Sequence, residues 1–216
     1  MFTCLYPLDY RRRQGTTYVD NKAMILMDLH LPEEMKKKDW MTVKVNQCYR
    51  NLNRLYWTEF HSYFLIQDFG GTVYPNQFCR NDWAKEWGKA EVRVNEISAN
   101  DYVDFVLGWL LRVMNDKVIV PPFQPVNFVT DIVKPVIKRI FHVYAVLFNL
   151  QSKYPVSLSS HTLLEEYFDH FIYVCIYWGL LDFSSDDVKA LDVVLQPIRE
   201  NYERDITELH KAGNEV

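Results

Sequence analysis

Four side chains able to bind an anion lie within the nine-residue stretch KPVIKRIFH, from Lys134 to His142. On a helix, Lys134, Lys138 and His142 follow one another at successive four-residue steps, and Arg139 lies beside them on the same ridge. We expect all four to oppose the apolar side of that helix. A guanidinium and an ammonium can together satisfy a phosphate dianion, but a solvated polar face would show the same spacing. Spacing alone leaves both interpretations open.

The sequence carries no signature of catalysis. It contains no glycine-rich phosphate loop and no HExxH, CxxC or GxSxG motif. His161 and His170 are nine residues apart, too far for two metal ligands on adjacent helical turns, and the neighbours Glu165 and Glu166 point to different faces. Each of these side chains is more typical of a surface or hydrogen-bonded polar residue than of a catalyst.

The helix that must position the candidate anion seat is predicted from about Asn127 to Leu150. Its apolar residues recur at three- and four-residue intervals: Val129, Ile132, Val133, Val136, Ile137, Ile140, Phe141, Tyr144, Leu147 and Phe148. Pro135 lies inside this stripe and predicts a kink. A second amphipathic helix is predicted over 40–60. Its polar face is expected to carry Lys44, Gln47, Asn51, Arg54 and Thr58.

The remaining elements follow from shorter signals. A small hairpin is predicted within 66–100, and a buried helix over 101–114 with Asn100 as its N-cap. Another helix is predicted from about Ser160 to Gly179, which is placed to end it. Ser184 and Asp187 resemble a capping box for a helix through Val194, and a terminal helix is predicted after Pro197.

Composition and charge bound the class of protein. The chain has 216 residues, 49% of them hydrophobic, with 33 aromatic residues and seven glycines, which favours one compact, mostly helical domain. We expect an irregular N-terminal arm over 1–30 and the helical domain over 31–216. No apolar run approaches the roughly 18 residues of a membrane span. Four scattered cysteines predict reduced thiols in a cytosolic or nuclear compartment.

The charge is unevenly distributed along the chain. Residues 36–54 carry six bases and one acid, a local charge of +5, whereas 182–216 carry nine acids and four bases, a local charge of −5. The net charge is −4. A nucleic-acid-binding protein would more often be basic overall, so this class is disfavoured.

Several segments, in order, are similar to the Mob family of kinase adaptors. PFQPVNFVTDIVKPVIKRIFHVYAVLFNL, from Pro122 to Leu150, resembles that family's P-F-P-x-N-F, an apolar helix and K-R-[LI]-F-R-V-Y-A. SANDYVDFVLGW, from Ser98 to Trp109, resembles S-A-P-x-Y-[IV]-D-Y-V-x-x-W. LPE before Trp40 and FDHFI after Tyr167 also match family patterns. The likeness covers roughly residues 31 to 195.

The resemblance implies an all-α bundle with a four-helix core and a small β-hairpin. It also implies a non-catalytic adaptor that binds and activates a kinase of the NDR/LATS type, in signalling of the Hippo or mitotic-exit kind. Family members dock phosphorylated partners on a K-R-x-x-R ridge, which Lys138 and Arg139 match. His142 replaces the last arginine, so the third charge would depend on pH. The implied location is cytoplasmic, or nuclear or at spindle poles or basal bodies.

The resemblance also implies a kinase-docking face and a structural zinc. The docking candidates are Glu33, Glu34, Asp39, Trp40 and Gln47. Lys36, Lys37 and Lys38 stand where the family has acidic or neutral residues, which would repel a basic kinase segment.

The family's four zinc ligands correspond here to Tyr63, Asp68, Val146 and Gln151, which cannot form a Cys2His2 tetrahedron. We therefore expect no zinc and no other cofactor, with His61, Asp68 and Cys79 as a remote substitute set. Two other functions stay open: a purely architectural subunit whose basic ridge is solvated, and a small helical ligand-binding protein or enzyme with a pocket between its helices.

Overall fold

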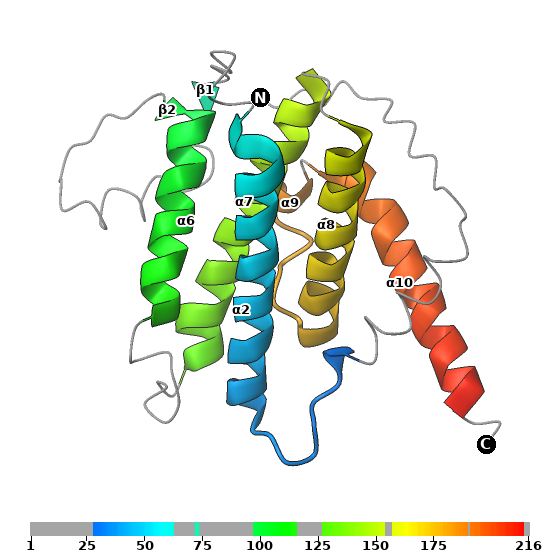
Figure 1. The fold of residues 1–216 in the computed structure, drawn as a ribbon. Helices are drawn as coiled ribbons and strands as arrows, with labels where there is room; N and C mark the ends of the chain where they lie inside the picture. The colour runs from blue at the N-terminus through cyan, green and yellow to red at the C-terminus, as the bar shows by residue number, and fades with distance from the viewer. Residues whose placement is uncertain are drawn as a thin grey trace.

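The computed structural model describes residues 28–62, 72–73, 97–115, 127–153, 157–189 and 191–213. These residues form a bundle of helices with one short antiparallel pair of strands at an end of the bundle (Figure 1). The strands are β1 (Thr72–Val73) and β2 (Ile97–Ser98), paired with Thr72 opposite Ser98. The predicted all-helical fold with a small strand pair is confirmed.

Helix α7 (Lys134–Lys153) is the central element. It contacts α2 (Lys37–Leu55), α6 (Ala99–Asn115) and α8 (Leu158–Trp178), which surround it in Figure 1. Because neighbours cover several of its sides, nearly every residue from Val136 to Leu150 is buried, including positions outside the predicted stripe. Central position, and not a single apolar face, therefore decides what α7 buries.

A π-helical turn lies at the start of α7, where Pro135 was predicted to kink the helix. The turn, η2 (Val129–Val133), closes with the Lys134 N–H donating to the Val129 carbonyl. Proline has no N–H to donate, and wide turns of this kind occur where the regular ladder is interrupted. The helical path therefore continues through the proline.

Helix α2 runs directly into a second π-helical turn, η1 (Tyr56–Phe60), so the predicted helix over 40–60 is confirmed in extent. Its predicted polar face is wrong at one position, because Lys44 is only 1% exposed. Lys44 lies three residues after Met41 and four before Cys48, and therefore shares their buried face.

Helix α6 begins at Ala99, so Asn100 lies within its first turn and the predicted N-cap is wrong. The Asn100 side chain instead contacts Tyr56: its Oδ1 lies 2.5 Å from the phenol oxygen, which is also 2.7 Å from Asp104 Oδ1. Burial and the Asp104 carboxylate raise the pKa of Tyr56 above its usual value. This cluster joins the start of η1 to the start of α6.

The predicted end of α8 is confirmed. Gly179 follows the helix with φ of +62°, the left-handed conformation that glycine adopts without a Cβ clash. At the other end the Ser157 side chain accepts a hydrogen bond from the Ser160 N–H, a cap that the sequence interpretation missed. Cys175 on α8 and Cys48 on α2 are both buried free thiols.

The region after α8 differs from its prediction in two ways. The Ser184 hydroxyl donates to Asp182 Oδ1 at 2.6 Å, so it does not cap a helix through Val194, and the short helix α9 spans Asp186–Lys189. The last helix, α10 (Asp192–Gly213), begins before Pro197 and contains it. Pro197 is in the second turn, so it removes one backbone hydrogen bond without ending the helix.

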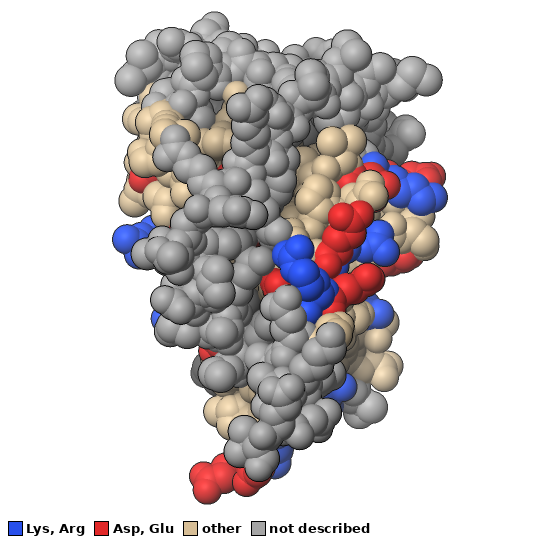
Figure 2. All heavy atoms as spheres, turned by 90° about the vertical axis from the view of Figure 1, so that its right-hand side faces the viewer, with Lys and Arg blue, Asp and Glu red and all other residues tan. Residues whose placement is uncertain are grey.

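Helix α10 packs against α8. The Tyr173 hydroxyl donates to Asp205 Oδ2 at 2.7 Å, and the rings of Tyr173 and Tyr202 meet edge to face 5.1 Å apart. Figure 2 shows the face of the molecule that carries α10: its described acidic and basic side chains lie side by side and do not form a patch of one sign. None of the described helices is long and apolar enough to cross a membrane.

The packed body begins before residue 31. Leu29 is fully buried in the core, and the indole N–H of Trp40 donates to its carbonyl oxygen at 3.4 Å. Most of the predicted arm, residues 1–27, lies outside the described residues.

Candidate docking sites

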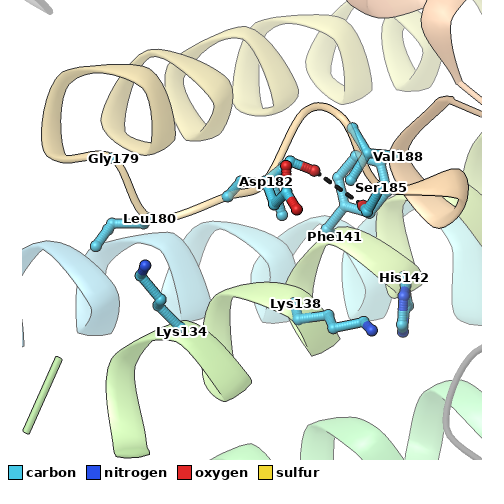
Figure 3. A pocket seen from close by; sticks show the side chains of 10 residues that line it. Lys134, Lys138, Phe141, His142, Gly179, Leu180, Asp182, Ser185 and Val188 are labelled. Atoms are coloured by element: carbon cyan, nitrogen blue, oxygen red, sulfur yellow. Dashed lines mark hydrogen bonds between the residues drawn. The ribbon is translucent and has the colours of Figure 1, made fainter. Parts of the chain in front are cut away.

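A pocket of about 280 Å³ lies between α7 and the chain that follows α8. Lys134, Lys138 and His142 line it from α7, and the segment from Gly179 to Val188 lines it from the other side (Figure 3). Phe141, Leu180 and Val188 provide its apolar part. Three of the four candidates for the anion seat therefore share one concave surface, which the spacing alone could not show.

The four candidates do not share one environment, so the expectation that all four oppose the apolar side of the helix is wrong in part. Lys134 and Lys138 are exposed, but His142 is 1% exposed and Arg139 is 8% exposed. The Arg139 guanidinium lies over the Trp109 ring of α6, 3.7 Å from its centre. Stacking of this kind uses the flat face of the guanidinium. Arg139 thus joins α6 to α7 and does not line the pocket.

Asp182 places one negative charge at the pocket. Its Oδ1 accepts hydrogen bonds from the Ser184 N–H at 2.9 Å and the Ser184 hydroxyl at 2.6 Å. These bonds, together with the positive charges of Lys189 and Lys134, lower the pKa of Asp182. The carboxylate therefore stays ionised at neutral pH and opposes a second anion in the same pocket.

The five predicted kinase-docking residues divide into a surface group and an inward group. Glu33 and Glu34 are exposed in a turn before α2, and Asp39 lies half-buried in the first turn of α2, where an acid suits the helix dipole. Trp40 and Gln47 instead contact the chain that precedes them: Trp40 hydrogen-bonds Leu29, and Gln47 Nε2 donates to Asp28 Oδ2 at 3.4 Å.

A partly buried charged cluster surrounds Gln47. Lys44 Nζ lies 2.5 Å from Asp28 Oδ2, donates to Gln47 Oε1 at 3.2 Å and lies 4.3 Å from the centre of the Trp40 ring. His170 of α8 faces the same carboxylate, with Nε2 3.9 Å from Asp28 Oδ2. No catalytic or metal motif pointed to this cluster. The signal that could have found it is the position of Lys44 between Met41 and Cys48.

The described residues at the family's zinc positions do not fit a zinc ion. Val146 is an apolar core residue, 7% exposed, and the Gln151 amide contacts His161 Nδ1. Neither an alkyl group nor an amide N–H is a zinc ligand. Tyr63 and Asp68, the other two positions, lie outside the described residues.

The predicted substitute set cannot be assembled from the described part of the chain. Asp68 and Cys79 lie outside it, and His61 is half-buried with its ring 4.3 Å from that of Trp57. Within the described ranges no three His, Cys, Asp or Glu side chains converge as metal ligands would.

A hydrogen-bonded clasp joins η1, α7 and α8 near the family's zinc position. Because Gln151 Nε2 donates to His161 Nδ1, the His161 Nε2–H faces Glu165 Oε1, 3.3 Å away. The Ser160 hydroxyl donates to Glu59 Oε2 of η1 at 2.6 Å. Burial lowers the pKa of His161. The pKa of Glu165 is raised, mainly by burial and further by the negative charge of Glu166. Polar side chains thus connect the three elements directly.

Comparison with known proteins gives consistent matches. The model of the Mob1/phocein family matches residues 18–190. The chain is 28% identical over 179 residues to a Dictyostelium discoideum protein named MOB kinase activator-like 1 homolog A, a match that covers 79% of each chain.

Two further relatives show a similar extent. MOB kinase activator-like 1A of Arabidopsis thaliana is 30% identical over 159 residues, 71% of each chain. The maintenance of ploidy protein mob1 of Schizosaccharomyces pombe is 22% identical over 179 residues, 80% of this chain and 82% of that protein. The matches therefore span most of the helical body.

Proposed function

The chain belongs to the Mob1/phocein family, and we propose that it is a non-catalytic adaptor that binds and activates a protein kinase of the NDR/LATS type. Two of the relatives described above are named as kinase activators. The exposed acids Glu33 and Glu34, with Asp39, form the candidate kinase contact, and the exposed Lys36 and Lys37 next to them weaken it for a basic kinase segment.

We further propose that phosphorylated segments of partner proteins dock at the α7 pocket. The observation that carries this proposal is the pair of exposed lysines, Lys134 and Lys138, which line a pocket together with apolar side chains. Two ammonium groups can neutralise a phosphate dianion, while Phe141 and Leu180 offer contact area to a neighbouring apolar side chain. Arg139 supports the site by fixing α7 against Trp109.

The resemblance implies a structural zinc, and in this proposal the chain's own side chains hold together the elements that the zinc would join. Val146 and the clasp of Gln151, His161 and Glu165 support a fold that needs no metal. Elemental analysis of chelator-treated protein, combined with its melting temperature, tests this point. Less than about one-tenth of an equivalent of zinc and an unchanged melting temperature are expected, and a stoichiometric metal would contradict the proposal.

Phosphopeptide docking is tested with a fluorescent phosphothreonine peptide and its unphosphorylated form. We expect the wild-type protein to bind the phosphorylated form at least tenfold more tightly, and Lys134→Glu/Lys138→Glu to lose this preference. The control Arg54→Glu/Arg112→Glu reverses two exposed charges on α2 and α6 and should keep it. Equal affinity of all three proteins for the phosphorylated peptide would contradict the proposal and leave the two lysines as solvated surface residues.

Kinase activation is tested with a purified NDR/LATS-type kinase and a separate variant at the acidic turn before α2. We expect added wild-type protein to raise kinase activity and Glu33→Lys/Glu34→Lys to remove the effect. Because both acids are exposed and distant in sequence from α7, this variant should still bind the phosphopeptide. If kinase activity did not change when the wild-type protein was added, the proposed activation would be wrong and a purely architectural role would remain.

A further inference from the structure

We propose that α2 and α8 together form a binding site for a single carboxylate, which Asp28 of the same chain fills. Three donors from two helices converge on this carboxylate: Lys44 Nζ at 2.5 Å, Gln47 Nε2 at 3.4 Å and His170 Nε2 at 3.9 Å, all measured to Asp28 Oδ2. Neither the family match nor the proposed docking functions assign such a site.

The cationic side of the site is part of the bundle itself. Lys44 is 1% exposed, and its ammonium is held between the Gln47 carbonyl oxygen and the face of the Trp40 ring. A buried ammonium costs several kcal/mol unless it is paired, so a carboxylate at this place stabilises the bundle. Lys44 therefore belongs to the fixed part of the site.

His170 completes the fixed part from α8. It is 8% exposed, and its Nδ1 has no hydrogen-bond partner among the described residues. The tautomer that carries its proton on Nε2 therefore suits this place, because Nε2 is the atom that faces the Asp28 carboxylate. Desolvation lowers the pKa of His170 and favours this neutral form; the Asp28 carboxylate acts in the opposite direction but is outweighed by burial together with the Lys44 charge.

The anionic side is different, because it is replaceable. The Asp28 side chain is 42% exposed, compared with 2% for that of Lys44. Asp28 comes from the segment that precedes α2, and this segment is fastened at two neighbouring points, the buried Leu29 side chain and its carbonyl bonded to Trp40. The carboxylate therefore acts as a latch that holds residues 28–31 on the bundle.

The chemistry of the site defines its ligand class as a carboxylate with access from solvent. An aspartate or glutamate of a protein partner offers the same group as Asp28. The tethered Asp28 has a high effective concentration at the site, so an outside carboxylate binds only weakly while Asp28 is present. Removal of the Asp28 carboxylate should uncover the site without removing any of its donors.

The decisive experiment is chemical rescue of Asp28→Ala in the full chain. This variant should melt roughly 5 °C below the wild type, because the buried Lys44 loses its counter-charge. Sodium acetate should restore most of the loss in a saturable manner, whereas sodium chloride at equal ionic strength should not. Acetate should have no comparable effect on the wild-type protein.

Two controls keep the result interpretable. Asp28→Ala/Lys44→Met removes both charges, and its melting temperature should not respond to acetate. Asp28→Asn keeps the shape of the side chain and serves if Asp28→Ala does not fold. Acetate that raised the melting temperature of Asp28→Ala and of the double variant equally would overturn the proposal, as would a response to chloride of the same size.

A capped tripeptide with a central aspartate separates the two sources of the carboxylate. If it stabilises Asp28→Ala as acetate does, the site accepts a carboxylate from another protein. If only acetate acts, the site exists but its protein ligand is Asp28 of this chain. A wild-type chain whose residues 28–31 exchange amide hydrogens as fast as those of Asp28→Ala would show that no latch operates, and would contradict the proposal.

Discussion

Lys44 on α2 and Lys138 on α7 are the same residue type in two amphipathic helices, yet they have opposite surroundings. Lys44 is enclosed by Trp40, Gln47 and Asp28, whereas Lys138 lines a pocket open to solvent. A charge inside the bundle must be paired to persist, so it specifies where a segment lies. A charge at the surface tolerates changes of partner, so it suits docking.

The sharpest test of this comparison is the loss of each lysine in turn. Lys44→Ala should lower the free energy of unfolding by about 3 kcal/mol, because it leaves a cavity in place of a buried side chain and removes the ion-pair partner of Asp28. Lys138→Ala should change it by less than about 0.5 kcal/mol, as at most exposed positions. Urea unfolding followed by circular dichroism measures both. Similar losses for the two variants would remove the distinction between the regions.

Arg139 sharpens the comparison from inside the predicted ridge. Arg139→Ala should cost about 1–2 kcal/mol of stability, because it removes the guanidinium from the Trp109 ring. Arg139→Lys keeps the charge but not the planar stack, so we expect it to recover only part of this loss. Arg112→Ala, an exposed arginine on α6, is the matched control. Phosphopeptide affinity should fall more for Lys138→Ala than for Arg139→Ala.

The buried region should also depend on pH through His170. Its pKa is lowered in the folded state, so below about pH 6.5, the ordinary value, the unfolded chain binds a proton that the folded chain rejects. Stability is therefore full above that pH and falls as the pH drops toward the folded pKa. The groups facing His170 are Asp28 and Lys44.

The measurement for His170 is the difference in unfolding free energy between wild type and His170→Gln across pH 5 to 8. We expect the wild type to lose more stability on acidification than the variant. Parallel curves for the two proteins would mean that other groups account for the acid response.

The smallest expected effect concerns the acid at the exposed pocket. Asp182→Asn removes a negative charge near Lys134 and should tighten phosphopeptide binding by about two- to threefold at low salt, and by less as salt screens the pocket. Anisotropy titrations at two salt concentrations give both values. Tighter binding that did not depend on salt would point to a change of pocket shape instead of charge.

The sequence predicted features that depend on local chemistry. Gly179 was placed at the end of α8 because glycine adopts a left-handed conformation without strain, and it has φ of +62°. The long apolar stripe placed α7 in the core for the same kind of reason. Neither prediction required knowledge of what packs on the helix from elsewhere in the chain.

Features that depend on distant neighbours were not predicted. Arg139 and His142 were expected to oppose the apolar side of α7 because a single helix shows only one stripe, but both are buried, Arg139 against Trp109 of α6 and His142 beside the segment after α8. Lys44 was misplaced because the pairing carboxylate comes from Asp28 and the facing imidazole from α8. The pocket itself required residues about 45 positions apart to meet, from Lys134 to Gly179.

Cys48 and Cys175 sit in the same interior as the Lys44 cluster, and burial raises the pKa of the Cys48 thiol to about 12. The thiolate is the form that reacts with maleimides, so neither cysteine should react while the helices remain packed. With Cys4 and Cys79 replaced by serine, the rate of alkylation of the two buried cysteines would measure how often the native bundle opens. Alkylation of Cys48 and Cys175 would therefore show whether removal of the Asp28 carboxylate destabilises only the segment over the site or the whole helical bundle.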